Sequence, residues 1–271
     1  MKRHYTSIIS NIFGKFASTK FPKPIQSTIN YLYVKLMGLD MSEFRAPSEY
    51  ESLNALFTRE LVKKREIPKD KRVIISPVDA LVTDFGEIEE GKAYQIKGMD
   101  YCIAELFGEY HQKAFRAVKN GEFVNLYLSP KDYHRYHFPD KLKVKSVTHI
   151  PAKLYPVNFP LLRHKKNLFI ENERVIVECR DENKRVFVMV LVGALNVGKM
   201  VLTFENRVKT NSDIREPQHY KYKDLWFEKG ELFGWFEMGS TILLFFEKGV
   251  FKPNLKVNQK VKFGEPIGEK I

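Results

Sequence analysis

The stretch Thr241-Ile242-Leu243-Leu244-Phe245-Phe246-Glu247 decides the fold, because it is a short apolar run bounded by polar residues, as a buried strand is. From about Arg72 onward similar β-rich runs recur, and Gly, Asn, Asp and Lys residues separate them. The other runs are Val73–Ile75, Phe123–Leu128, Val175–Cys179, Val186–Val192 and Met200–Phe204. Together they predict an α+β chain with a mainly antiparallel β core, sandwich-like or barrel-like, and few core helices.

A boundary between a helical arm and this core is expected near residues 66–72, where a proline stands in a charged cluster. Residues 1–66 are therefore predicted to form a helical N-terminal region, and residues 67–271 a β-rich domain. Within the β-rich domain, the apolar residues between Gly98 and Gly108 predict one short helix.

The composition is that of an ordinary globular protein, since 44% of the 271 residues are hydrophobic and 29% are charged. These proportions exclude disorder, collagen and coiled coil as the main structure, and the length suffices for a substantial core. The two cysteines, Cys102 and Cys179, exclude a disulfide framework and a four-thiolate zinc site. They favour a reducing compartment.

Positive charge is concentrated at the N-terminus. The chain has 45 Lys and Arg against 33 Asp and Glu, a formal net charge of +12, and its first acidic residue is Asp40. Apolar residues of the same stretch form two clusters, the first at helical spacing. They are Ile8, Ile9, Ile12, Phe13 and Phe16, then Ile29, Tyr31, Leu32, Val34, Leu36 and Met37. A basic segment with an apolar face suits an anionic membrane surface, and the alternative is an ordinary arm packed on the core.

No membrane-spanning helix is expected, because Ile242–Phe246, the longest apolar run near the C-terminus, is far shorter than the roughly 20 residues of a span. The basic start Met1-Lys2-Arg3 resembles a signal peptide, but polar residues interrupt the apolar region and no small-residue cleavage site follows. Secretion by a standard signal is therefore not predicted. Nucleic acid is not a predicted partner, because the sequence carries no nucleic-acid motif.

Two short segments carry residues suited to proton transfer. Ser76-Pro77-Val78-Asp79 places an acid directly after a strand and a proline turn, where Asp is most often a turn residue. The segment 132–139 holds His134 and His137 among aromatic residues, and an imidazole transfers protons near neutral pH. The two histidines could equally be a structural pair bonded to backbone, or metal ligands.

A third segment runs from Lys153 to Asn158 and is followed by Asn172-Glu173-Arg174. Tyr155 and Asn158 could line a polar pocket that binds substrate. Equally, these side chains could satisfy the backbone groups of a loop.

The Gly239-Ser240 bond, directly before the apolar strand, permits a specific reaction. The Ser240 hydroxyl can attack the Gly239 carbonyl and convert the amide into an ester. Elimination then breaks the chain and leaves a dehydroalanine, which hydrolyses to a pyruvoyl group. Each step needs a base near the hydroxyl, which a histidine held by an aspartate could supply. Glycine suits the position before the cut, because a residue without Cβ tolerates the strained backbone that attack requires.

Taken in order, these segments resemble the phosphatidylserine decarboxylase family. The resemblance extends over about residues 50 to 250, and the ordered set is far more specific than any one motif. The matching segments are Phe57-Thr58-Arg59-Glu60-Leu61, Ser76-Pro77-Val78-Asp79, Tyr133-His134-Arg135-Tyr136-His137-Phe138-Pro139, Leu154-Tyr155-Pro156-Val157-Asn158, Asn172-Glu173-Arg174, Val192-Gly193-Ala194 and Gly239-Ser240-Thr241.

The resemblance implies a role for four residues. Ser240 is the cleavage serine and becomes a covalent pyruvoyl group, which is the cofactor. His137 activates the Ser240 hydroxyl, and Asp79 orients His137. His134 serves the decarboxylation step, either as proton donor or by positioning the substrate.

The implied activity is that of a carboxy-lyase, the pyruvoyl-dependent decarboxylation of phosphatidylserine to phosphatidylethanolamine, for which no metal is needed. Cleavage after Gly239 yields a β chain of residues 1–239 and an α chain of residues 240–271, which stay associated, and a homodimer is compatible with this arrangement. Because the substrate lies in an anionic membrane, the chain is expected to be a peripheral protein at the cytoplasmic face of the cell membrane.

Three rival interpretations stay open. Asp79, His134 and His137 could be the ligands of a zinc hydrolase, although that gives Ser240 no role. The chain could be a non-catalytic β module, since its end, Val257–Ile267, is turn-rich like a carrier or barrel hairpin. The same pyruvoyl chemistry could act on a soluble amino acid or an altered lipid.

Overall fold

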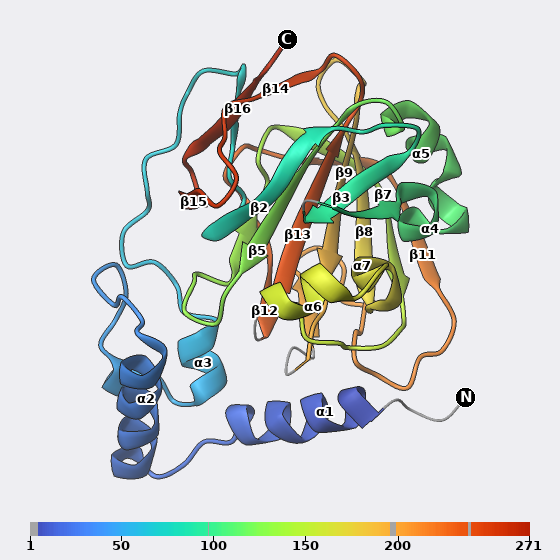
Figure 1. Cartoon of the computed structure of the whole chain (residues 1–271). Coiled ribbons are helices and arrows are strands. Elements are labelled where there is room, and N and C mark those ends of the chain that lie inside the picture. The colour runs from blue at the N-terminus through green and yellow to red at the C-terminus, as the bar shows by residue number, and fades with distance from the viewer. Residues whose placement is uncertain (1–4, 97, 196–198, 238–239) are drawn as a thin grey trace.

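The computed structural model describes residues 5–96, 98–195, 199–237 and 240–271. Its N-terminal helices lie together at one end of the sheets, and the C-terminus lies at the opposite end (Figure 1). These helices are α1 (Tyr5–Ser18), α2 (Lys23–Met37) and α3 (Leu53–Phe57), with a 3-10 turn η1 (Pro47–Glu49) before α3. The rest of the chain forms mainly antiparallel sheets, which confirms the predicted α+β class with an N-terminal helical arm.

The central feature is an eight-stranded antiparallel sheet. Its strands, in spatial order, are β11 (Gln218–Phe227), β7 (Leu142–Ile150), β8 (Arg174–Arg180), β9 (Val186–Val192), β13 (Ser240–Phe246), β5 (Glu122–Leu128), β2 (Ala80–Glu87) and β15 (Lys260–Val261). β13 pairs with β9 on one side and β5 on the other, and its run Ile242–Phe246 is buried throughout. A central strand that is covered on both faces has a continuous apolar sequence. For this reason the sequence predicted β9 and β13 correctly.

Three smaller sheets complete the β structure. They are β10 (Lys199–Leu202), β12 (Leu232–Glu237) and β6 (Arg135–His137); β1 (Val73–Ile75), β16 (Pro266–Lys270) and β14 (Phe251–Pro253); and the hairpin β3 (Lys92–Ile96) with β4 (Met99–Cys102). β12 and β13 are successive in the chain but belong to different sheets, so the Gly239-Ser240 bond falls where the chain changes sheets.

Short helices pack beside the large sheet (Figure 1), and they are more numerous than the one short helix that the sequence predicted. They are α4 (Ile103–Phe107), η2 (Glu109–His111), α5 (Gln112–Val118), α6 (Phe159–His164) and α7 (Leu168–Glu171). None exceeds two turns, and such short helices leave no periodic signal in a sequence. The stretch Gly98–Gly108 forms β4 and then α4, which ends at Gly108 because φ there is +68°.

Helix α2 turns its polar side toward the protein. The buried Asn30 amide donates hydrogen bonds to the carbonyls of Pro47 and Tyr50, both at 2.9 Å, and Gln26 donates to Asn30 at 2.8 Å. Tyr33 and Val34 pack against the buried cluster of the arm, whereas five other large apolar side chains of α2 are exposed. They are Ile25, Tyr31, Leu32, Leu36 and Met37. These five side chains therefore have no covering partner among the residues that the structure describes. Among the helices described, none is both long and apolar enough to cross a membrane.

Candidate active site

Ser240 is the first residue of β13, and its backbone pairs with Leu128 at the end of β5. At the end of β12, the Phe236 N–H donates to the carbonyl of His134 at 3.0 Å. Gly239, the predicted residue before the cut, lies outside the described residues. The strand register alone therefore brings the start of β13 and the His134 segment to the same end of the two sheets.

His134 is a buried, neutral base with one unused lone pair. Its Nδ1 lies 2.8 Å from the carbonyl oxygen of Asp132, and because a carbonyl only accepts, Nδ1 carries the proton. Its Nε2 is buried and has no hydrogen-bond partner among the described residues. The Phe57 ring packs against the imidazole at 4.0 Å between ring centroids. Burial and, to a smaller extent, the positive charge of Arg59 lower the pKa of His134 to about 3.

His137 is also buried, but both of its ring nitrogens are engaged. Its Nδ1 donates to the carbonyl of Gly230 at 3.0 Å, and its Nε2 accepts from the Tyr133 hydroxyl at 3.1 Å. The imidazole stacks on Phe263 with ring centroids 3.6 Å apart. Burial lowers the pKa of His137 to about 4, and the Gly230 hydrogen bond and the charges of Arg135 and Arg65 modify it less. The two histidines of the motif therefore differ, because both ring nitrogens of His137 are hydrogen-bonded and only one ring nitrogen of His134 is, among the described residues.

Asp79 is held by an arginine rather than by a histidine. Arg65 donates through both terminal nitrogens to the Asp79 carboxylate, the Nη2–Oδ2 distance being 2.9 Å. The same guanidinium binds Glu43 through two further hydrogen bonds, and the Phe263 N–H donates to Asp79 at 2.7 Å. Phe263 thus contacts Asp79 through its backbone and His137 through its ring. Among the described contacts there is no direct Asp79–His137 hydrogen bond.

A buried arginine fixes the loop between β5 and β6. Arg59 donates through Nη2 to the carbonyls of Lys131 and Asp132, at 2.8 and 3.2 Å, and lies over the Phe44 ring at 4.4 Å. The Asp132 carboxylate accepts hydrogen bonds from the backbone and the hydroxyl of Ser129, and burial raises the pKa of Asp132. Because the Asp132 carbonyl orients His134, Arg59 holds the backbone that sets the direction of this imidazole.

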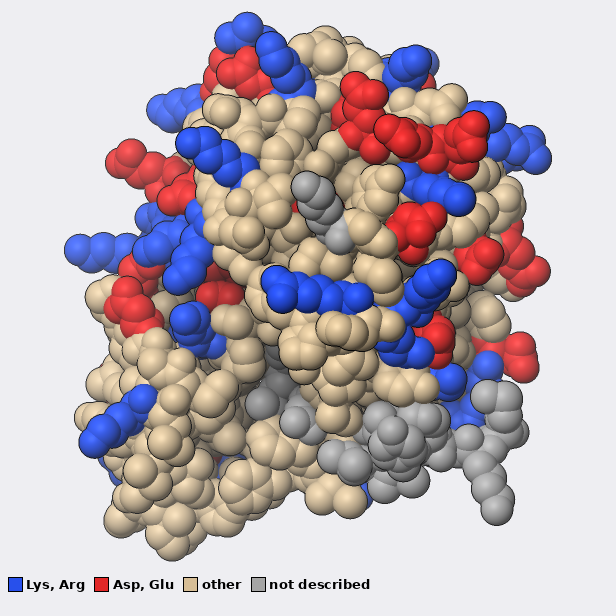
Figure 2. Space-filling model, viewed as in Figure 1, with Lys and Arg blue, Asp and Glu red and all other residues tan. Residues whose placement is uncertain are grey.

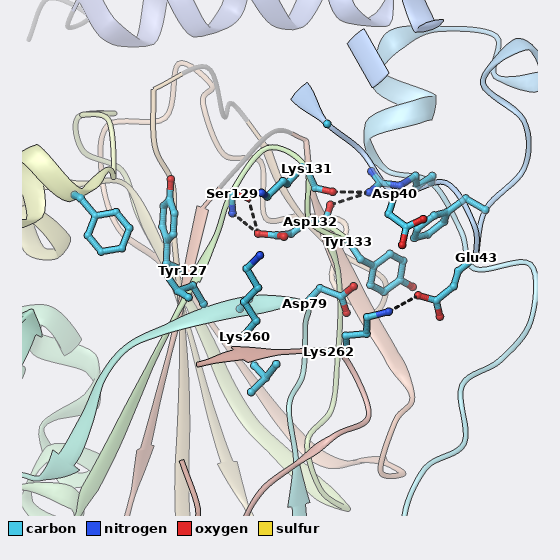
Figure 3. Close-up of a pocket in the computed structure, with 17 residues that line it drawn as sticks. Asp40, Glu43, Asp79, Tyr127, Ser129, Lys131, Asp132, Tyr133, Lys260 and Lys262 are labelled. Carbon is cyan, nitrogen blue, oxygen red and sulfur yellow. Dashed lines mark hydrogen bonds and ion pairs between the residues drawn. The ribbon is translucent and has the colours of Figure 1, made fainter. Parts of the chain in front are cut away.

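A cavity of about 450 Å³ opens beside this loop, between the large sheet and the helical arm (Figure 3). The lining includes the aromatic residues Phe44, Tyr127, Tyr133 and Phe159, some small and aliphatic residues, and several charged side chains. These include Asp40, Asp79, Lys131, Asp132, Lys260 and Lys262. A cavity that combines aromatic surface with charges of both signs suits an amphipathic, zwitterionic ligand.

The predicted substrate-binding residues Tyr155 and Asn158 are not among the residues that line this cavity, although Phe159, next to Asn158, is. Asn158 is the N-cap of α6, where its side-chain oxygen accepts from the Leu161 N–H at 3.1 Å. The backbone of Tyr155 exchanges two hydrogen bonds with the Asn172 side chain. In this structure the Asn158 side chain caps a helix, and the Tyr155 backbone is tied to the neighbouring segment.

The structure does not support a metal centre built from the histidine pair. Among the residues described, no three His, Cys, Asp or Glu side chains gather as metal ligands would. His137 and Asp79 are both saturated by protein partners, as shown above. The zinc interpretation therefore has no ligand set in the described part of the chain.

No role in the site was predicted from the sequence for three residues, Tyr133, Arg65 and Lys260. Tyr133 stands four residues before His137, and that spacing within the motif was an available signal for a contact. Arg65 lies outside every matching segment, and Lys260 lies in a two-residue strand, so no pattern marked either residue. Both enter the site only because distant segments pack together.

The structure thus places two buried histidines in a mainly antiparallel α+β chain, and comparison with known proteins identifies its family. The family model described as phosphatidylserine decarboxylase matches residues 53–269. The chain therefore belongs to the phosphatidylserine decarboxylase family, which confirms the resemblance seen in the sequence.

Curated relatives agree with this assignment over nearly the full chain. A phosphatidylserine decarboxylase proenzyme of Campylobacter jejuni is 47% identical, the match covering 96% of this chain and 97% of the relative. One from Helicobacter pylori is 45% identical, with 97% of each chain covered. A third, from Marinobacter nauticus, is 34% identical over 96% of this chain and 93% of the relative. The expectation of a carboxy-lyase is confirmed by these relatives.

Proposed function

We propose that this chain is a proenzyme that cleaves itself between Gly239 and Ser240 and then decarboxylates phosphatidylserine to phosphatidylethanolamine. The observation that carries the proposal is the family match over residues 53–269, which includes every segment named above. The products of cleavage are chains 1–239 and 240–271. The second chain begins with β13, which pairs with β5 and β9, so hydrogen bonds on both sides hold it in place after the cut.

Self-cleavage converts Ser240 without any external reagent except water. The hydroxyl adds to the carbonyl of residue 239 as its proton leaves, and the C–N bond breaks to give an ester. Loss of the α-proton expels the carboxylate of residue 239 and leaves a dehydroalanine, which water converts to pyruvoyl with release of ammonia. We assign the base to His137, oriented by Asp79. For this, Ser240 must replace Tyr133 at His137 Nε2, and Asp79, now bound by Arg65, must replace the Gly230 carbonyl at His137 Nδ1.

The residues around Ser240 fit a pyruvoyl group at that position. The unpartnered Nε2 of His134 is buried at the end of the sheet where Ser240 begins, so it is a proton-transfer atom without a structural task. When present, the group supplies a sink for the electron pair released with carbon dioxide. We assign to His134 the uptake of a proton at Nε2, which turns the neutral ring into an imidazolium, and the return of this proton to the substrate carbon. Its low pKa favours giving that proton up.

We further propose that residues 1–66 bind the membrane and that residues 67–271 form the catalytic domain. On α2 the apolar side chains face outward, and Leu36 is 79% exposed. On α1, Ile12 is 65% exposed. Figure 2 shows little charge on the lower-left surface, over α2. Exposed apolar side chains on a basic arm support insertion into the interface of an anionic bilayer.

The proposed location is the cytoplasmic face of the cell membrane, with the chain attached peripherally. Neither cysteine is in a disulfide, Cys179 being buried, and this supports a reducing compartment. A bilayer that contains phosphatidylserine supplies both the anionic surface and the substrate.

The intact mass of the purified protein under denaturing conditions tests the proposal. We expect two chains split between Gly239 and Ser240, the smaller one blocked by a pyruvoyl group. Ser240→Ala should give one uncleaved, inactive chain, and His137→Ala or Asp79→Asn should slow or block cleavage. His134→Ala should cleave normally but release carbon dioxide from phosphatidylserine about a hundredfold more slowly.

The matched control for these substitutions is His164→Ala, because His164 is exposed and lies outside the site. It should leave both cleavage and decarboxylation at the parent level. A full-length parent chain would refute the self-cleavage chemistry. A fully active His134→Ala variant would refute the role of His134. A cleaved enzyme that releases carbon dioxide from a soluble amino acid but not from the phospholipid would favour the rival substrate.

A further inference from the structure

We infer that Lys260 and Lys131 form the subsite that binds the phosphodiester of the lipid substrate. This inference rests on the proposed function, since it names the part of the substrate that the cavity described above receives. A phosphodiester keeps one negative charge throughout the reaction, so its partner must be a cation that no protein carboxylate neutralises.

The sheet register relates Lys260 to the strand that begins with Ser240. Lys260 pairs with Leu81, Leu81 with Tyr127, and Tyr127 with Thr241, the residue after Ser240. Three strand spacings separate the ends of this row, or about 14 Å between backbones. An extended lysine spans roughly 6 Å, and the four bonds from the serine nitrogen to the phosphorus span roughly 5 Å. These lengths and one hydrogen bond of about 3 Å sum to about the length of the row, although side chains rise from a sheet rather than lie along it.

The charges around the cavity leave these two lysines available. Lys262 binds Glu43 at 3.1 Å, and Arg65 neutralises Asp79. The Asp132 carboxylate lies near Lys131 but accepts its two hydrogen bonds from the backbone and hydroxyl of Ser129. Asp40 accepts from the Ser42 N–H. Neither Lys131 nor Lys260 makes an ion pair or side-chain hydrogen bond among the described residues, and both line the cavity.

The direction of the side chain agrees with this assignment. Figure 3 shows the Lys260 amine pointing from β15 into the cavity, toward the loop that carries Ser129 and Asp132. Lys131 belongs to that same loop, so the two lysines approach the cavity from opposite sides. After cleavage Lys131 would lie in chain 1–239 and Lys260 in chain 240–271, so the phosphodiester would be held between the two chains.

The decisive experiment compares Lys260→Gln and Lys131→Gln with the parent enzyme on a short-chain phosphatidylserine that stays monomeric in solution. A monomeric substrate removes the general attraction of lysines to an anionic bilayer. We expect each variant to cleave itself as the parent does and to show a KM about tenfold higher. Glycerophosphoserine should compete with the substrate in the parent enzyme, and about tenfold less well in the Lys260→Gln variant.

The matched control is Lys256→Gln, because Lys256 is an exposed lysine four residues before Lys260 and does not line the cavity. Its KM should equal that of the parent. An unchanged KM in both Lys260→Gln and Lys131→Gln overturns the subsite and leaves the proposed function standing. Inhibition by inorganic phosphate as strong as that by glycerophosphoserine overturns it as well, since the site would then be a general anion site. A parent enzyme inactive on phosphatidylserine overturns the proposed function and the subsite together.

Discussion

Acid should destabilise the uncleaved chain through its two buried histidines. An unfolded histidine has a pKa of about 6.5. Folding lowers the pKa to about 3 for His134 and to about 4 for His137, chiefly through burial. Between these values the unfolded state binds more protons than the folded state, so stability falls as the pH falls. The contribution is fully present above pH 6.5 and is lost progressively toward the folded pKa.

The size of the effect at pH 5.0 follows from these pKa values. pH 5.0 lies about 1.5 units below the unfolded pKa, and one unit corresponds to about 1.4 kcal/mol. Each histidine therefore lowers the free energy of unfolding by about 2 kcal/mol at this pH. The pair therefore lowers the free energy of unfolding by about 4 kcal/mol between pH 7.5 and 5.0. A carboxylate such as Glu43, whose pKa is lowered to about 2 by hydrogen bonds from Arg65, loses its contribution only below about pH 4.5. Measurement at pH 5.0 thus separates the histidines from such carboxylates.

Urea unfolding of the Ser240→Ala chain, followed by fluorescence of its two tryptophans, measures this difference. The loss of unfolding free energy between pH 7.5 and 5.0 should shrink by about 2 kcal/mol in His134→Gln and again in His137→Gln. The control His164→Gln removes an exposed imidazole and should retain the parent's loss. If His134→Gln and His137→Gln lose as much unfolding free energy between pH 7.5 and 5.0 as the parent does, burial does not hold these histidines neutral.

Two further predictions concern the membrane arm and the small sheet. Replacing both Leu32 and Leu36 by Glu should reduce cosedimentation with phosphatidylserine vesicles at least about tenfold, because two apolar side chains no longer enter the bilayer. Ile271→Glu, which is 65% exposed at the opposite end of the molecule, should bind like the parent, and equal binding by all three proteins would exclude α2 as the contact. Gly234→Ala should lower the free energy of unfolding by about 3 kcal/mol in urea at pH 7.5, because a Cβ there meets the Val201 carbonyl and the Tyr136 ring. Gly14→Ala, with open space around it, should not lower this free energy, and an equal loss in both variants would mean that the clash is relieved at no cost.

The sequence predicted those parts of the fold in which burial leaves a pattern. β9 and β13 are covered on both faces and appear as continuous apolar runs. β11 escaped prediction because it is an edge strand that pairs only with β7 and is largely exposed. β6 has three residues, and its strand form depends on pairing with β12 rather than on its own composition.

The site was predictable to the level of segments but not of contacts. The motif spacing brought His134 and His137 into one short segment, and both prove to be buried. The partners of these side chains depend on tertiary packing. Phe263, for example, lies 126 positions after His137 and still stacks on it. No local pattern could show that Arg65 binds Asp79, or that Tyr133 rather than Asp79 meets His137.

The segment between α3 and β1 connects the exposed arm to the site through two arginines. Arg59 holds the loop whose Asp132 carbonyl orients His134, and Arg65 holds the Asp79 carboxylate. Both arginines are also tied to the arm, Arg59 through the Phe44 ring and Arg65 through Glu43. A displacement of the arm at a membrane surface would therefore act on His134 and Asp79 through these two guanidinium groups. Lysine keeps the positive charge of arginine but not its planar set of N–H donors. Replacing either arginine by lysine should therefore still disturb the positions of His134 and Asp79.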